Sequence, residues 1–73
     1  MTIETQTFAD LIVLGMTDEA ALQSIEYHLE KYDNGCGADH LEIADQLITA
    51  LDNVYGALSY HNYKENGTLP SQQ

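Results

Sequence analysis

Positive charge is nearly absent from this sequence. It contains two lysines, Lys31 and Lys64, and no arginine, against twelve aspartates and glutamates, so its formal net charge is −10. A protein that binds nucleic acid through its phosphates needs a basic face, and two lysines cannot form one. Direct binding of DNA or RNA is therefore excluded, and the same count argues against anionic membranes and phosphorylated ligands.

Cysteine and long apolar runs are also scarce. Cys36 is the single cysteine, so no disulfide can form within the chain, as is usual in a reducing compartment. The longest purely aliphatic run covers residues 11–14, which is far too short to cross a bilayer. The first residues lack the basic region of a secretory signal. We therefore expect a cytoplasmic protein without a membrane partner.

The sequence does contain regularly spaced apolar residues, which make up 44% of the chain together with the tyrosines. Seventy-three residues allow a single small domain. Turn residues cluster near positions 15, 33–37 and 66–70 and divide the chain into three helical segments and a tail. The sequence therefore predicts an all-α fold, with one helical domain over residues 1–67 and a flexible polar tail over residues 68–73.

The first two helical segments have recognisable ends. The first is predicted over residues 8–14, with Thr7 as its N-cap and Gly15 as a left-handed residue that ends it. The second is predicted to begin after Thr17, whose hydroxyl can cap the first turn, and to continue to about Asp33.

The third segment is predicted to be one long helix from Asp39 to Asn66, antiparallel to the second. Asp39 and Glu42 match the aspartate version of a capping box, and no proline follows before Asn66. Its apolar side spans roughly 200°, more than one neighbouring helix covers. Either the first helix or a second subunit must cover the rest. We expect a homodimeric helical bundle whose interface contains Ile43, Ala50, Val54, Tyr55, Ala57, Leu58 and His61.

Carboxylates recur at helical spacing on the polar sides of the second and third segments. They are Glu19, Glu26, Glu30, Asp33, Glu42, Asp45 and Asp52. Their rows place charges roughly 5 to 10 Å apart, comparable to the phosphates of a nucleic-acid strand. Tyr60 and Tyr63 are predicted on the same polar side of the third helix, and tyrosine is a residue that protein interfaces favour.

These features favour a protein that binds other proteins. The leading hypothesis is an inhibitor that docks its acidic helices on a basic, nucleic-acid-binding surface of another protein and blocks it, as a mimic of DNA. In size and charge the chain resembles small inhibitors that phages and mobile elements direct against host defence or regulatory proteins. The alternative is a helical dimer that contacts its target through the apolar and tyrosine-rich surface of the third helix. Solubility alone is a third explanation of the acidic surface.

Catalytic and metal-binding chemistry has little support. Cys36 lies in a Gly-Cys-Gly turn, a setting that a flexible connection explains by itself. Cys36, Asp39 and His40 are close in sequence, and His28 or His61 could join them, but one thiolate lacks the paired ligands of zinc sites. We therefore expect no enzyme activity, no cofactor and no metal site.

Overall fold

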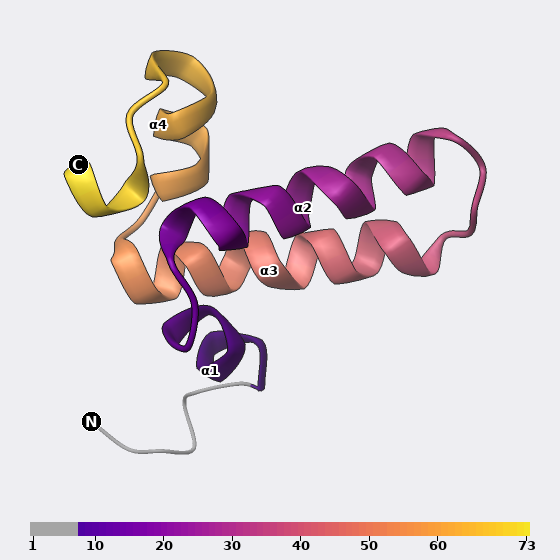
Figure 1. Cartoon of the computed structure of the whole chain (residues 1–73), viewed down its shortest axis with the longest axis horizontal. Helices are drawn as coiled ribbons and strands as arrows, with labels where there is room; N and C mark the ends of the chain where they lie inside the picture. The colour runs from indigo at the N-terminus through magenta and orange to yellow at the C-terminus, as the bar shows by residue number, and fades with distance from the viewer. Residues whose placement is uncertain (1–7) are drawn as a thin grey trace.

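An antiparallel hairpin of two helices is the centre of the fold (Figure 1). The computed structural model describes residues 8–73, and this part of the chain is entirely helical apart from its turns. The first prediction, an all-α class, is thereby confirmed. In chain order the elements are α1 (Phe8–Leu14), α2 (Asp18–Asp33), α3 (Asp39–Tyr55), α4 (Ser59–Asn66) and a short 3₁₀ helix, η2 (Pro70–Gln72).

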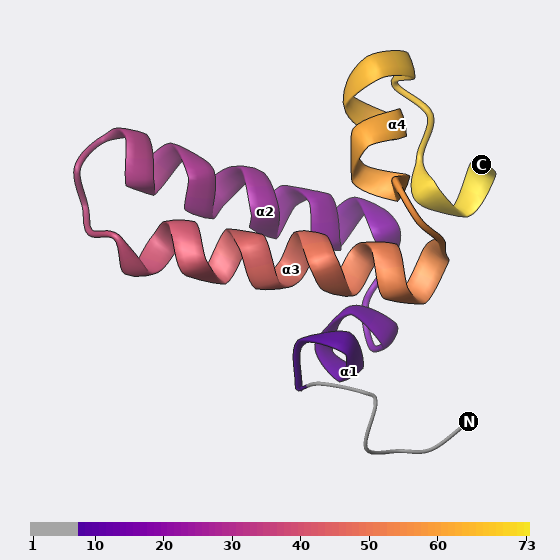
Figure 2. The same cartoon turned by 180° about the vertical axis from the view of Figure 1, so that it is seen from behind.

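The helix α3 is central to the fold, because α1, α2 and α4 all pack against it. Figures 1 and 2 show α1 along the edge of α3 that faces away from α2, whereas α4 and η2 lie beyond the other edge, near the start of α2. The apolar side of α3 is therefore covered mainly by α1 and α2 of the same chain. This arrangement answers the question that the sequence left open about the first helix.

The ends of α2 agree with the sequence prediction. The Thr17 hydroxyl accepts a hydrogen bond from the backbone N–H of Ala20 at 3.1 Å, which satisfies one of the unpaired donors at a helix start. The helix ends at Asp33, and Gly35 then takes a left-handed φ of 81°, where the absence of a Cβ removes the steric cost.

The end of α1 differs from its prediction. Gly15 does not have a positive φ, and its N–H donates to the carbonyls of Leu11 and Ile12 at 3.2 and 3.1 Å. The helical turn is therefore completed by ordinary backbone bonds, and the predicted left-handed cap at Gly15 is wrong. Thr7, the proposed N-cap of this helix, lies outside the described residues.

The start of α3 also corrects the sequence analysis. The N-cap is Ala38, which is already in the right-handed helical region and has no capping side chain. Asp39 is instead the first residue of the helix, so it cannot serve as the cap of a capping box. Its carboxylate, with that of Glu42, still lies in the first turn, where negative charge complements the helix dipole.

The prediction of one long third helix is wrong, because α3 ends at Tyr55. Glycine costs about 1 kcal/mol relative to alanine inside a helix, and Gly56 leaves the helix with a φ of 127°. Leu58 follows in the left-handed region, with a φ of 65°, a conformation that is unfavourable for leucine. The chain thereby turns, and α4 folds back toward the hairpin instead of extending α3 to Asn66.

The buried core of the described part of the chain is small. Within residues 8–73 its apolar side chains come from α1, α2 and α3, and they are Val13, Ala21, Leu22, Ile25, Ala44, Leu47, Ala50 and Leu51. Three of these eight are alanines, which contribute little apolar area each. Ala50 is 1% exposed inside its own chain, so its predicted place in a dimer interface is wrong, since its own neighbours already cover it.

Residues 68–73 do not extend away from the helices as the expected polar tail. Pro70 is buried, and Leu69 packs against the core. Ser71 is bound through its N–H and its hydroxyl, which both donate to Asp18 Oδ2, at 3.0 and 2.6 Å. This segment therefore covers the start of α2.

Candidate protein-binding surface

Six of the seven carboxylates predicted to bind a partner are exposed on the hairpin, and five of these six are free of polar side-chain contacts within the described part of the chain. None of the five makes an ion pair or a side-chain hydrogen bond with any residue in the described range 8–73. They are Glu19, Glu30 and Asp33 on α2, and Glu42 and Asp45 on α3. Exposed carboxylates that lack neighbouring cations keep their full charge available for a partner.

The two lysines do not neutralise this set. Lys64 on α4 lies 3.5 Å from Glu26 Oε2, and Lys31 on α2 lies over the ring of Tyr27, 5.5 Å from its centroid. Both cations are therefore engaged elsewhere, and the five free carboxylates give the hairpin an uncompensated negative surface.

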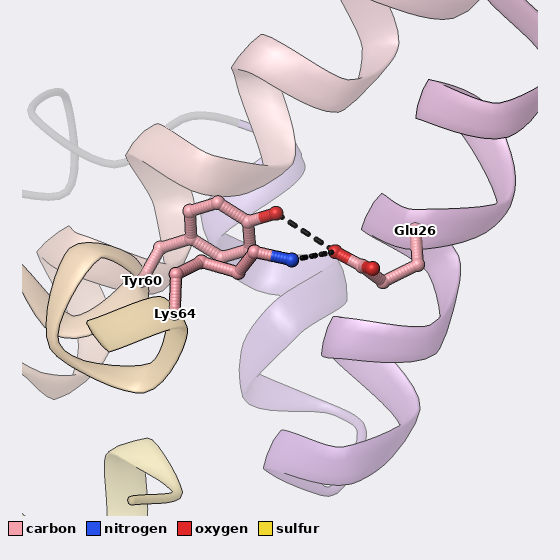
Figure 3. Close-up of polar contacts among 3 residues, drawn as sticks. All are labelled: Glu26, Tyr60 and Lys64. Carbon is pink, nitrogen blue, oxygen red and sulfur yellow. Dashed lines mark hydrogen bonds and ion pairs between the residues drawn. The ribbon is translucent and has the colours of Figure 1, made fainter. Parts of the chain in front are cut away.

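The remaining two carboxylates, Glu26 and Asp52, hold the fold together. The Tyr60 hydroxyl donates to Glu26 Oε2 at 2.8 Å, and Lys64 approaches the same oxygen (Figure 3). The backbone N–H of Tyr60 donates to Asp52 Oδ1 at 3.3 Å. These contacts join α4 to both helices of the hairpin, so these two carboxylates are the least free of the seven to bind a partner.

Tyr60 and Tyr63 do not lie on the polar side of a continuous third helix, so their predicted placement is wrong. The turn at Gly56 brings both rings toward the hairpin, where they are half-buried and pack against the core, with centroids 6.4 Å apart. Tyr63 also lines a hollow beside α2. A partner-binding role of the two tyrosines stays a prediction.

That hollow lies on the acidic side of α2. Its volume is about 320 Å³, and it is bounded by α2, by α4 and by the segment that follows α4. Glu19, Glu26 and Glu30 contribute the negative charge, while Tyr63 and Leu69 contribute apolar surface. An acidic rim beside an apolar wall is suited to a basic side chain with a long aliphatic stem.

Tyr60 is the group whose ionisation the site changes most. Burial raises the pKa of Tyr60 well above its ordinary value of 10, and the hydrogen bond to Glu26 and the charge of that carboxylate raise it further. A pKa that is raised in the native state stabilises the fold at pH values below the ordinary pKa. This contribution is lost as the pH rises through the raised pKa. We expect one late tyrosine in an alkaline absorbance titration of the native protein. Tyr60→Phe should abolish the part of the absorbance change that occurs at the highest pH, whereas Tyr63→Phe should retain it. If the two variants give the same titration curve, Tyr60 is freely exposed.

Two histidines meet across the hairpin, which the sequence analysis missed. His28 Nδ1 and His40 Nδ1 are 2.9 Å apart, and the rings stack with centroids separated by 5.1 Å. One nitrogen must donate and the other accept. This contact could have been expected from the antiparallel register of two helices joined by a turn at residues 33–37, which brings residues 28 and 40 opposite each other. Among the described residues, no three histidines, cysteines or acids come together as a metal site, and Cys36 is exposed.

The other residues predicted for a dimer interface are scattered. Val54 and Tyr55 are half-buried against the core, whereas Ile43, Ala57 and Leu58 are exposed. His61 is exposed on α4 and lies 3.3 Å from Glu65. Since α3 ends before three of these residues, they do not form the continuous helical seam that the sequence predicted.

Within residues 8–73, no helix has the length and apolar character needed to span a membrane. Comparison with protein-family models, with curated proteins and with solved structures gave no match for this chain.

Proposed function

We propose that this protein binds a basic surface of another protein through the exposed carboxylates of the α2–α3 hairpin and thereby blocks that surface. The observation that carries the proposal is the set of five unpaired, exposed carboxylates, Glu19, Glu30, Asp33, Glu42 and Asp45. A nucleic-acid-binding groove of a host defence or regulatory protein is the target that fits best, since it evolved to bind regularly spaced negative charge.

The net charge of −10 supports this proposal. Ten uncompensated charges on a chain of this size repel one another and cost stability, and a basic partner removes that repulsion. The same charge accelerates the encounter by electrostatic steering. Long-lived binding also needs apolar contact at the centre of the interface, which Leu69 and Tyr63 can supply in the hollow beside α2.

The alternative hypothesis, docking through the apolar and tyrosine-rich surface of the third helix, has less surface to use than the sequence suggested, because Tyr60 and Tyr63 lie on α4. Leu47 and Leu51 of that surface are buried by neighbouring helices of the same chain. Binding through α3 would require α1 or α2 to detach from it first. The acidic proposal needs no such rearrangement, and this difference favours it.

The test uses two charge reversals that change the net charge equally but lie at different places. Glu30→Lys reverses a free carboxylate of the hairpin, whereas Glu65→Lys reverses an exposed carboxylate of α4. Glu26 is avoided because its reversal would also break the contact with Tyr60. Tagged proteins are used to capture partners from lysate, with washes at about 0.05 M and 0.5 M NaCl.

We expect the native protein and Glu65→Lys to retain a nucleic-acid-binding protein at low salt, and Glu30→Lys to lose it. High salt should release it from the native protein and from Glu65→Lys, and nucleic acid should compete for its surface. Retention by Glu30→Lys at high salt would contradict the proposal and indicate an apolar contact instead.

A further inference from the structure

The helix α1 leaves an apolar surface uncovered. Phe8 is 79% exposed, Leu11 and Leu14 are each 54% exposed, and Ile12 and Ile43 of α3 are more than one third exposed. We call these five residues the α1 surface. Single exposed apolar side chains are common on proteins, whereas four of them on one short helix give α1 a largely apolar exposed side, which is a feature of interaction sites.

A hollow of about 480 Å³ lies beside these side chains, between α1 and α3. Phe8 and Ile12 line it from α1, and Ile43 and Leu47 line it from α3. For comparison, an engineered apolar void of about 150 Å³ accommodates benzene. The α1 surface therefore contains protruding apolar side chains and a hollow that can receive them, next to each other. A two-fold contact between identical subunits requires such self-complementarity.

The α1 surface and its hollow contain few charged side chains, which bears on the kind of molecule that binds there. The only charged residue of α1, Asp10, is turned inward, is 4% exposed and accepts a hydrogen bond from Asn53 of α3 at 3.3 Å. Asp45 is the one acidic residue among the described residues that line the hollow. The other four free carboxylates do not line the hollow, so it offers a basic partner a single charge. A second copy, which carries the same net charge, meets only this one carboxylate inside the hollow.

The small core supplies a reason for association. Within residues 8–73, three of the eight buried apolar residues are alanines, and chains below about 80 residues commonly need oligomerisation, metals or disulfides to complete their stability. The chain has one cysteine, so an internal disulfide cannot supply this stability. Apolar burial against a second copy can.

We propose that two copies of this chain associate with two-fold symmetry through the α1 surface, so that Phe8 of each enters the hollow of the other. This places the interface on α1 and the start of α3, in contrast to the sequence prediction, which placed it on the second half of the third helix. The variants that test the proposal leave all five free carboxylates unchanged, so its failure can be distinguished from failure of the proposed function. Asp45 lines the hollow and is the one free carboxylate that the second copy would approach.

Sedimentation equilibrium distinguishes the two interfaces with matched substitutions. Leu11→Glu lies within the α1 surface, and Leu58→Glu lies at the corner between α3 and α4, where the sequence placed the interface; both leucines are more than half exposed. We expect the native protein and Leu58→Glu to sediment at twice 8.1 kDa. Leu11→Glu should weaken association by about 100-fold or more and sediment as a monomer. Circular dichroism should show native helicity in all three, and Phe8→Ser replaces Leu11→Glu if that variant is unfolded.

Salt separates this contact from binding to a basic partner. Because both subunits are strongly negative, screening should strengthen the association between about 0.05 M and 0.5 M NaCl, whereas a basic partner is released. A native protein that stays monomeric at both salt concentrations would overturn the proposal. So would dissociation by Leu58→Glu with a dimer retained by Leu11→Glu, which would place the interface at the other end of α3.

Discussion

Leu51→Ala is expected to lower the free energy of unfolding by about 3 kcal/mol. Leu51 is fully buried on α3, the helix against which α1, α2 and α4 all pack. Truncation of a leucine in such a position removes its transfer free energy and leaves a cavity that the neighbouring helices fill only in part. A chain of this length has a total stability of roughly 4 to 11 kcal/mol. One substitution can therefore remove a large part of it.

Urea denaturation followed by circular dichroism measures this loss, and Leu58→Ala is the matched control. It removes the same atoms from a leucine that is 59% exposed, so we expect a change within about 0.5 kcal/mol. If the two variants unfold at the same urea concentration, Leu51 is not buried in solution and the described packing around α3 is incorrect.

The hairpin could be predicted because its signals are local. Thr17 and Ala20 are three residues apart, and the turn after Asp33 is marked by Asn34 and Gly35. Each of these features acts within one turn of the chain, so inspection of a short segment is sufficient.

The break at Gly56 could not be predicted in the same way. A single glycine inside an apolar pattern costs about 1 kcal/mol, which many helices tolerate. The break forms because α4 gains contacts with distant residues when it folds back. Tyr60 reaches Glu26, which is 34 residues away, and Asp52. The sequence shows these three residues but not their proximity.

The same limit applies to the candidate site. Helical spacing correctly placed Glu19, Glu30 and Asp33 on an exposed side of α2, since one helix determines which of its residues share a side. It could not show that Glu26, on that same side, is bound by Tyr60 and Lys64 of α4. Nor could it show that α1 covers part of α3 and leaves its own opposite side exposed.

Replacement of residues 68–73 by a glycine-serine sequence is the second change with a large expected effect, a loss of about 2 kcal/mol. It removes the buried Pro70 and the packing of Leu69 against the core. With glycine at position 71 it also removes the hydrogen bond from the Ser71 hydroxyl to Asp18, although the backbone N–H donor stays, and it removes the bond that Gln73 Nε2 donates to the Ser59 carbonyl at 3.0 Å. Urea denaturation measures the loss. Unchanged stability would show that this segment is the loose tail that its polar composition suggests.

Ser71→Ala separates the polar part of this contact from the apolar part. The side-chain and backbone hydrogen bonds from Ser71 hold the pKa of Asp18 below its ordinary value of 3.8. A carboxyl pKa that is lowered in the native state stabilises the fold at pH values above the ordinary pKa. This contribution disappears as the pH falls through the lowered pKa. In Ser71→Ala we expect the pKa of Asp18, measured by NMR titration, to rise toward 3.8, and the acid sensitivity of stability to decrease. Glu19→Gln is the control, because the Glu19 side chain does not contact Ser71 and its loss should leave Asp18 largely unchanged. An unchanged Asp18 pKa in Ser71→Ala would mean that the Ser71 hydroxyl does not bind Asp18. The stability lost in the glycine-serine variant would then have to come from the packing of Leu69 and Pro70 and from the Gln73 bond.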